Sequence, residues 1–293
     1  MDVGIALPQM APGLDRGRFL AWCRAIDEGP FSSISAGERI TFDNLDGFTL
    51  LAAAAAATER VRILFNVVVA PWHRVPLLAK ELASTDVLSG GRVEVAVGVG
   101  GRQQDYEALD AAFDGRFGRL DAAVDELRRL WRGEPLLDGA GVGPRPVQPG
   151  GPRILCSGTG PRSLARAARW ADGVSSFTIA ADPTEAAEVF RSADEAWSEA
   201  GRTDRPRRLT ASFVALGPGA QETLVDFGER YLAVFGERAA KGLSRRMPLH
   251  TEEALADFLR GVARTGCDEV VLVPATSDPA LVERLAEVVR SVV

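Results

Sequence analysis

Short apolar segments alternate with longer segments of helical periodicity along the whole chain, and this alternation restricts the fold more than any other feature. The strand candidates are residues 3–7, 31–36, 61–69, 93–97, 153–156, 173–177, 209–216 and 269–273. The helix candidates are residues 14–28, 50–59, 77–88, 117–131, 162–171, 184–200, 220–235, 252–264 and 279–292. Thr251 and Asp278 stand where N-caps of the last two helices are expected.

The pattern predicts a parallel sheet. Segments such as "RILFNVVVA" are almost continuously apolar, which is typical of strands buried on both faces. Strand–helix alternation favours right-handed crossovers, and eight such units in 293 residues predict a (β/α)8 TIM barrel. An open doubly wound sheet is the alternative. We expect a single domain over residues 1–293, with the Pro- and Gly-rich residues 139–153 forming a surface connection.

Composition excludes several classes of function. The net charge of -6 and the pI of about 5.2 argue against nucleic-acid binding. The alanine run 52–57 is too short to cross a membrane, and residues 1–10 lack the features of a signal peptide. The three cysteines are far apart and do not suggest a disulfide framework or a metal site. We therefore expect a cytoplasmic protein that acts on a small molecule, with no metal, membrane or nucleic-acid partner.

Glycines mark two strand ends, where the active site of a barrel lies. The fourth strand is followed by Gly98, Gly100 and Gly101, although Gln103 breaks the dinucleotide-binding fingerprint and no Walker motif follows. Glycine permits positive φ angles and close approach of a flat ligand. This turn by itself is a weak signal.

The fifth strand ends in the stronger candidate for a phosphate site. Ser157, Gly158, Thr159 and Gly160 form a turn that runs directly into a helix, where free amides and the helix dipole attract anions. The alternative is a tight turn that needs glycine for its geometry only. Ser176 and Phe177, at the end of the sixth strand, are candidates for contacts with the same ligand.

Polar residues at earlier strand ends are further candidates. Glu38 and Arg39 follow the second strand, and a surface ion pair is the alternative interpretation. Asn66 interrupts an apolar strand and must find hydrogen-bond partners, either in a ligand or in neighbouring backbone. His73 lies in the next loop, where an incidental role is also open, and Gln9 follows the first strand. No Ser-His-Asp set, HExxH motif or carboxylate pair is evident, which indicates that a cofactor supplies the chemistry.

Together these segments resemble the bacterial luciferase-like flavin and deazaflavin oxidoreductases. The resemblance is carried by residues 78–101, "LAKELASTDVLSGGRVEVAVGVGG", and by residues 116–131, 154–177 and 265–289. It covers most of the chain, and the shorter members that use coenzyme F420 are the most similar. It implies a (β/α)8 barrel, a cofactor ring over the barrel mouth, and usually a homodimer. Apolar faces such as that of residues 50–61 would suit packing in a dimer.

The resemblance also implies roles for particular residues. A non-proline cis peptide within Asn66, Val67 and Val68 would support the ring, and Gly158, Thr159 and Gly160 would hold the phosphate. Gly98 and Ser157 belong to the same two turns, and Gly100 and Gly101 would line the path of the cofactor. Glu38-Arg39 stands where several deazaflavin members carry Asp-His, and arginine cannot serve as a proton-shuttling base. Arg39 is instead expected to hold an anion, and His73 to supply a proton.

Three functions follow from this resemblance. The first is an F420-dependent oxidoreductase that transfers a hydride between reduced deazaflavin and a small organic substrate. The second is an FMN-dependent monooxygenase that uses oxygen. The third is a non-catalytic barrel that binds a flavin-type molecule.

Overall fold

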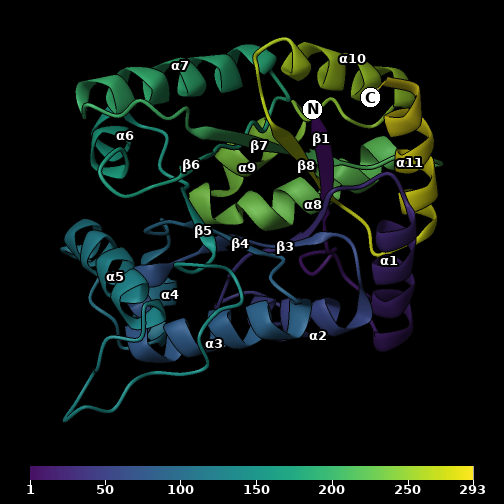
Figure 1. The fold of residues 1–293 in the computed structure, drawn as a ribbon. Helices are drawn as coiled ribbons and strands as arrows, with labels where there is room; N and C mark the ends of the chain where they lie inside the picture. The colour runs from purple at the N-terminus through teal and green to yellow at the C-terminus, as the bar shows by residue number, and fades with distance from the viewer. Residues whose placement is uncertain (293) are drawn as a thin grey trace.

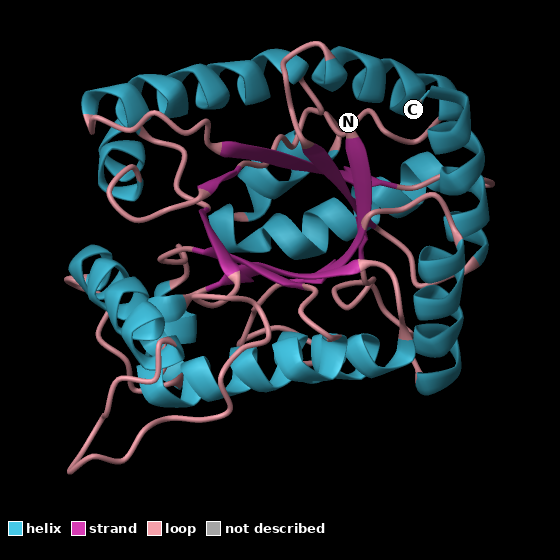
Figure 2. Ribbon diagram, viewed as in Figure 1, coloured by secondary structure: helices cyan, strands magenta, loops and turns pink. Residues whose placement is uncertain are grey.

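Eight parallel strands close into a barrel in chain order, so the predicted (β/α)8 fold is confirmed and the open sheet is wrong (Figures 1 and 2). The computed structural model describes residues 1–292. The strands are β1 Asp2–Ala6, β2 Ser33–Ala36, β3 Arg62–Val68, β4 Val93–Val97, β5 Arg153–Cys156, β6 Gly173–Ser175, β7 Arg207–Val214 and β8 Glu269–Pro274. β1 pairs with both β2 and β8, which closes the sheet.

Helices surround the strands, as Figure 2 shows. They are α1 Arg16–Glu28, α2 Gly47–Ala57, α3 Val75–Ser89, α4 Gln103–Ala108, α5 Arg116–Trp131, α6 Pro161–Ala167, α7 Pro183–Glu199, α8 Ala220–Leu232, α9 Glu237–Ser244, α10 Glu252–Ala263 and α11 Ala280–Val292, with 3₁₀ turns η1 Ala70–Trp72 and η2 Ala233–Phe235. Thr251 and Asp278 accept hydrogen bonds from Ala254 N and Ala280 N, as expected of N-caps. The short helices α4 and α9 were not predicted, because neither spans enough turns to show a periodic apolar face.

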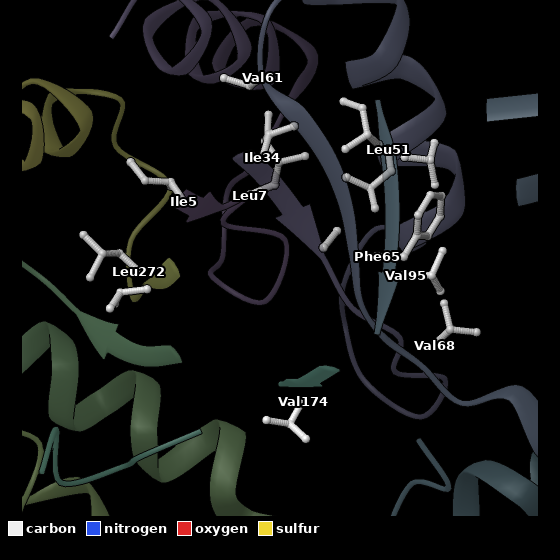
Figure 3. Close-up of a cluster of buried hydrophobic side chains, with 14 of the residues drawn as sticks. Ile5, Leu7, Ile34, Leu51, Val61, Phe65, Val68, Val95, Val174 and Leu272 are labelled. Carbon is white, nitrogen blue, oxygen red and sulfur yellow. The ribbon is translucent and has the colours of Figure 1, made fainter. Parts of the chain in front are cut away.

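Side chains alternate between the inside and the outside of the barrel because the strand repeat is two residues. Those on the outside pack against the helices, including Ile5, Ile34, Phe65, Val95 and Leu272 (Figure 3). Those in the middle of the interior form a separate small apolar layer, made of Ala6, Leu64, Ala96, Leu155, Leu209, Ala211 and Val271. This layer fills the centre of the barrel and leaves a polar layer at each end.

The layer at the amino ends of the strands is charged. Glu94 and Glu269 are almost fully buried and face Arg62 and Arg207. Arg62 Nη2 donates to Glu269 Oε2 at 2.8 Å, and Arg207 Nε donates to Glu94 Oε1 at 2.7 Å. The register between the strands brings these four residues together at the amino ends of the strands. A buried charge is tolerated only when a charge of opposite sign is paired with it in this way.

A long connection between α5 and β5 extends away from the barrel, as Figure 1 shows. The end of this connection that leads into β5 is fixed by Asp86, a fully buried residue of α3. Asp86 Oδ2 accepts hydrogen bonds from the amides of Val147 and Gln148, at 2.8 and 3.1 Å. Lys80 Nζ holds the connection nearer its tip by donating to Gly143 O at 2.6 Å. The sequence-based interpretation of residues 139–153 as a surface connection agrees with this path.

The apolar face of α2 is not available for a partner in the way the sequence suggested. Leu50, Leu51, Ala54 and Ala55 are all buried within the chain. The outward side of this helix consists of alanines such as Ala53 and Ala57. A homodimer stays a prediction, but the α2 leucines cannot form its interface. Within residues 1–292, no helix has the length and apolarity needed to span a membrane.

All three cysteine side chains are buried, and we expect them to be unreactive in the folded protein. Burial raises the pKa of Cys23 and of Cys267 to about 12, and burial also raises the pKa of Cys156. A raised pKa leaves almost no thiolate at pH 8, and the thiolate is the reactive form. A thiol-reactive chromogenic disulfide should therefore react with all three groups only after unfolding. Rapid reaction of one group in the native protein would contradict this expectation.

Candidate active site

A cavity of about 400 Å³ opens at the carboxyl ends of the strands, as expected for this fold. Its walls come from every part of the barrel, and also from the loop after β4 and from α8. The lining residues include Gln9, Met10, Ser35, Glu38, Asn66, Val67, Val69, Gly100, Arg102, Ser157, Thr159, Ser175, Ser176, Phe177, Phe213 and Tyr231. The interior apolar layer forms its floor through Ala6, Ala211 and Val271.

The end of β3 forms an irregular part of the cavity wall. The Asn66–Val67 peptide bond is cis, within the segment that the resemblance indicated. The pairing of β3 with β4 shifts by one residue between Asn66 and Val68. Asn66 Oδ1 accepts a hydrogen bond from Ser175 Oγ at 3.0 Å, and Asn66 itself lines the cavity. Its Nδ2 has no acceptor within the described chain, so a donor remains free beside the cavity. Val68 points into the outer core and does not line it.

Glu38 holds the same irregular segment from the β2 side. Its amide donates to Val67 O at 3.2 Å, and its Oε2 accepts from Val69 N at 2.6 Å. Its Oε1 is hydrogen-bonded to His73 Nε2 at 2.8 Å. The Glu38 side chain is 7% exposed and that of His73 is 19% exposed, so the pair connects the cavity wall with a partly exposed loop. His73 packs beside Phe48 and does not itself line the cavity.

Arg39 lies behind the cavity wall. Its guanidinium donates to Tyr231 O, near the end of α8, at 3.0 Å and lies 4.0 Å from the centroid of the Phe42 ring. Burial and the nearby charge of Arg102 lower the pKa of Arg39 to about 10, which leaves it protonated at neutral pH. Helix carbonyls at a C-terminus lack intrahelical partners, and Arg39 satisfies one of them. The contacts of Arg39 therefore connect the loop after β2 to α8.

A second cavity, of about 280 Å³, adjoins the first, with Gly100 and Ser157 lining both. It lies between the ends of β4 and β5 and the helices α5 and α6, where Phe117, Asp121, Cys156, Gly158, Ser163 and Arg166 also line it. Gly98, Gly100 and Gly158 thus line the same cavity. A Cβ on Gly98 would stand 2.2 Å from Ser157 Oγ, and Gly100 has a φ of +61°. Glycine at these two positions is explained by close packing and by backbone conformation.

The predicted site residues fall into three groups. The predicted residues that line the first cavity are Glu38, Asn66, Val67, Gly100, Ser157, Thr159, Ser176 and Phe177. Those that line the second cavity are Gly98, Gly100, Ser157 and Gly158. Gly101 and Gly160 are exposed and line neither of these two cavities, and a Cβ on either would meet nothing within 4 Å. Arg39, Val68 and His73 lie behind the walls.

Several lining residues carried no signal in the sequence. Tyr231 lies inside an ordinary amphipathic helix, and only the path of α8 across the barrel mouth brings it to the cavity. Arg102 follows the glycine turn and was not singled out, although a charge beside a glycine-rich strand end could have been noted. Ser175 and Phe213 lie on strands, and strand register determines that they point inward. Among residues 1–292, no group of three or more His, Cys, Asp or Glu is placed to hold a metal.

A model of the luciferase-like monooxygenase family matches residues 2–292. The chain belongs to this family. It is therefore a luciferase-like oxidoreductase, and its closed eight-stranded barrel agrees with this membership.

Individual relatives are more distant. The chain is 32% identical over 177 residues to the pyrimidine monooxygenase RutA of Cronobacter turicensis, a match that covers 54% of this chain and 46% of RutA. It thus spans about half the length of this curated relative. Two solved structures share its fold. Monooxygenase RslO1 from Streptomyces bottropensis has a TM-score of 0.81 and 23% identity, and the match covers 99% of both chains. An F420-dependent secondary alcohol dehydrogenase has a TM-score of 0.82 and 18% identity, covering 100% of this chain and 99% of the other.

Proposed function

We propose that this protein is an F420-dependent oxidoreductase acting on a small organic substrate. The observation that carries the proposal is the pair of adjoining cavities at the barrel mouth, which offers one space for a ring and another for a phosphate-bearing tail. When bound, F420 would supply or accept a hydride, whereas FMN, the alternative, would activate oxygen once reduced. The similar fold of an F420-dependent secondary alcohol dehydrogenase supports F420 as the cofactor.

The residues present suit such a cofactor. The free Nδ2 of Asn66 offers a donor to a ring edge, and Val67 and Val69 offer apolar contact beside it. Gly100 and Ser157 line both cavities, and their small size would leave room for a chain-like tail to extend from one cavity into the other. Gly101, Thr159 and Gly160 are exposed, so their backbone amides can face a phosphate. Ser176 and Phe177 would bound the ring space where it meets the rest of the cavity.

Within this proposal, Glu38 and His73 handle the proton. Glu38 faces the cavity and is hydrogen-bonded to His73, which is partly open to solvent. A proton can pass between solvent and the cavity through His73 Nε2 and Glu38 Oε1 without moving the backbone. Arg39 would act indirectly, by holding α8 and Tyr231 over the cavity. This arrangement replaces the histidine that the sequence lacks after β2.

The FMN-dependent monooxygenase is the second candidate, and the name of the curated relative RutA favours it. Both candidates use the same cavities, so the choice depends on measurement. The non-catalytic alternative would bind a flavin-type molecule without turnover. Cytoplasmic location and a homodimer remain predictions.

Titration of the purified protein with F420 and with FMN tests the proposal. We expect F420 to bind at micromolar concentration and more tightly than FMN, and reduced F420 to be oxidised in the presence of an acceptor substrate. Oxygen uptake that depends on reduced FMN and not on F420 would support the monooxygenase instead. Failure of both molecules to bind would overturn the proposal.

A further inference from the structure

Some of the residues that line the first cavity are aromatic, and they come from the end of β6, from β7 and from α8, whereas Asn66 lies on β3. The rings of Phe177 and Phe213 are 4.6 Å apart, and those of Phe213 and Tyr231 are 5.4 Å apart. Phe227 stacks behind Tyr231 with an interplanar angle of 9°. Phe177 remains 42% exposed although it is a large apolar residue that lines the cavity. The lining rings offer faces and edges to a flat molecule.

Two arginines without carboxylate partners lie beside one of these rings. Arg102 lines the cavity, and its guanidinium carbon is 5.5 Å from the centroid of Tyr231, while that of Arg39 is 5.0 Å away. Within residues 1–292, neither forms an ion pair, and the Nε of each is buried without a hydrogen-bond partner. Arg39 is only 8% exposed.

Asp105, a buried carboxylate nearby, offsets part of this positive charge but forms no ion pair with either arginine within the described residues. Its Oδ1 accepts hydrogen bonds from the amide and the hydroxyl of Thr41. Many other arginines of this chain, such as Arg207 and Arg208, are paired with carboxylates. Two partly desolvated cations beside a cavity, in a protein of net charge -6, therefore create a local preference for an anion.

We propose that the substrate is a small planar carboxylate whose ring packs on Phe177, Phe213 and Tyr231 and whose carboxylate pairs with Arg102. The proposal rests on the proposed function, because it takes the Asn66 side of the cavity to be the cofactor side. Arg102 is the contact residue. Arg39 is a positioning residue, which holds the Tyr231 backbone and adds positive charge behind it. A guanidinium presents two parallel donors to a carboxylate, so this pairing also orients the ring.

Calorimetric titration with benzoate and with benzamide tests the proposal, because the two probes share a ring and differ in charge. The protein is first saturated with whichever of F420 or FMN it binds, or used without either if neither binds. We expect benzoate to bind about tenfold more tightly than benzamide, a difference of about 1.4 kcal/mol. Arg102→Gln should remove this preference by weakening benzoate alone, and Arg102→Lys should retain part of it. Arg260→Gln, an exposed arginine on α10, is the matched control and should change nothing.

The outcomes separate the two proposals. Equal binding of benzoate and benzamide to the unaltered protein, or binding of neither, overturns the carboxylate subsite even when the cofactor binds. A benzoate preference that survives in Arg102→Gln also overturns it. If Arg102→Gln weakens F420 or FMN as much as benzoate, Arg102 belongs to the cofactor site and the inference is wrong. Failure of both cofactors to bind, with the benzoate preference intact, overturns only the F420 assignment.

Discussion

Replacing Glu269 by glutamine is expected to lower the free energy of unfolding by about 3–5 kcal/mol. Glu269 is fully buried, and its Oε1 accepts hydrogen bonds from Ser32 Oγ and Ser33 Oγ, each at 2.6 Å. Its Oε2 accepts from Arg62 and Arg207. The amide of glutamine keeps the shape but removes the charge, so Arg62 and Arg207 each lose one of two buried carboxylate partners and keep only Glu94. The midpoint of urea denaturation measures the effect.

Asp257→Asn is the matched control for this change. Asp257 is 70% exposed and pairs with Arg260 at 3.1 Å on the surface of α10, where an ion pair contributes only about 0–1 kcal/mol. We expect its denaturation midpoint to stay close to that of the unaltered protein. Equal, small effects of the two substitutions would show that the charged layer at the amino ends of the strands does not stabilise the barrel.

Replacing Ser157 by leucine is expected to weaken cofactor binding about a hundredfold, close to 3 kcal/mol. Ser157 lines both cavities, and its amide is fixed by a 2.9 Å hydrogen bond to Val97 O. The backbone at this position is therefore held in place, and the larger side chain would take up space at the boundary that the two cavities share. Fluorescence titration with F420 and FMN measures the change, and a thermal melt checks that the variant folds.

Ser157→Ala distinguishes blockage from loss of a hydrogen bond. It removes the hydroxyl without adding volume, and a single neutral hydrogen bond contributes about 0.5–1.5 kcal/mol. The alanine variant should therefore lose about tenfold in affinity at most. If the leucine variant folds and binds the cofactor as tightly as the alanine variant does, the boundary between the two cavities is not part of the cofactor site.

The fold was predictable from the sequence because its signal is repeated in every unit. Buried parallel strands require apolar runs, and the helices that cover them require apolar faces. The ends of the helices and strands were predicted less accurately than their existence. β7 begins at Arg207 and not at residue 209, since its first residues are charged and sequence patterns exclude charges from buried strands. The structure shows that Arg207 faces the charged layer inside the barrel.

The site was predictable only where a residue departs from the sequence pattern that surrounds it. Asn66 breaks an apolar strand, and it lies on the cavity wall next to a cis peptide. Glycines after β4 and β5 also marked the right strand ends. Tyr231 and Arg102 could not be recognised, because their place depends on how α8 and the loop after β4 cross the barrel mouth. No local pattern encodes that path.

The attachments that hold the β5 side of the connection between α5 and β5 affect how the chain tolerates a change in length. Asp86 holds the backbone at Val147 and Gln148, and Lys80 holds it at Gly143. The tip around Leu137, which is 71% exposed, lies outside both attachments. Extending a surface loop costs little free energy, because the entropy of closure grows slowly with loop length. We therefore expect the tip to tolerate insertions, deletions or a fused tag without disturbance of β5 or of the turn that follows it.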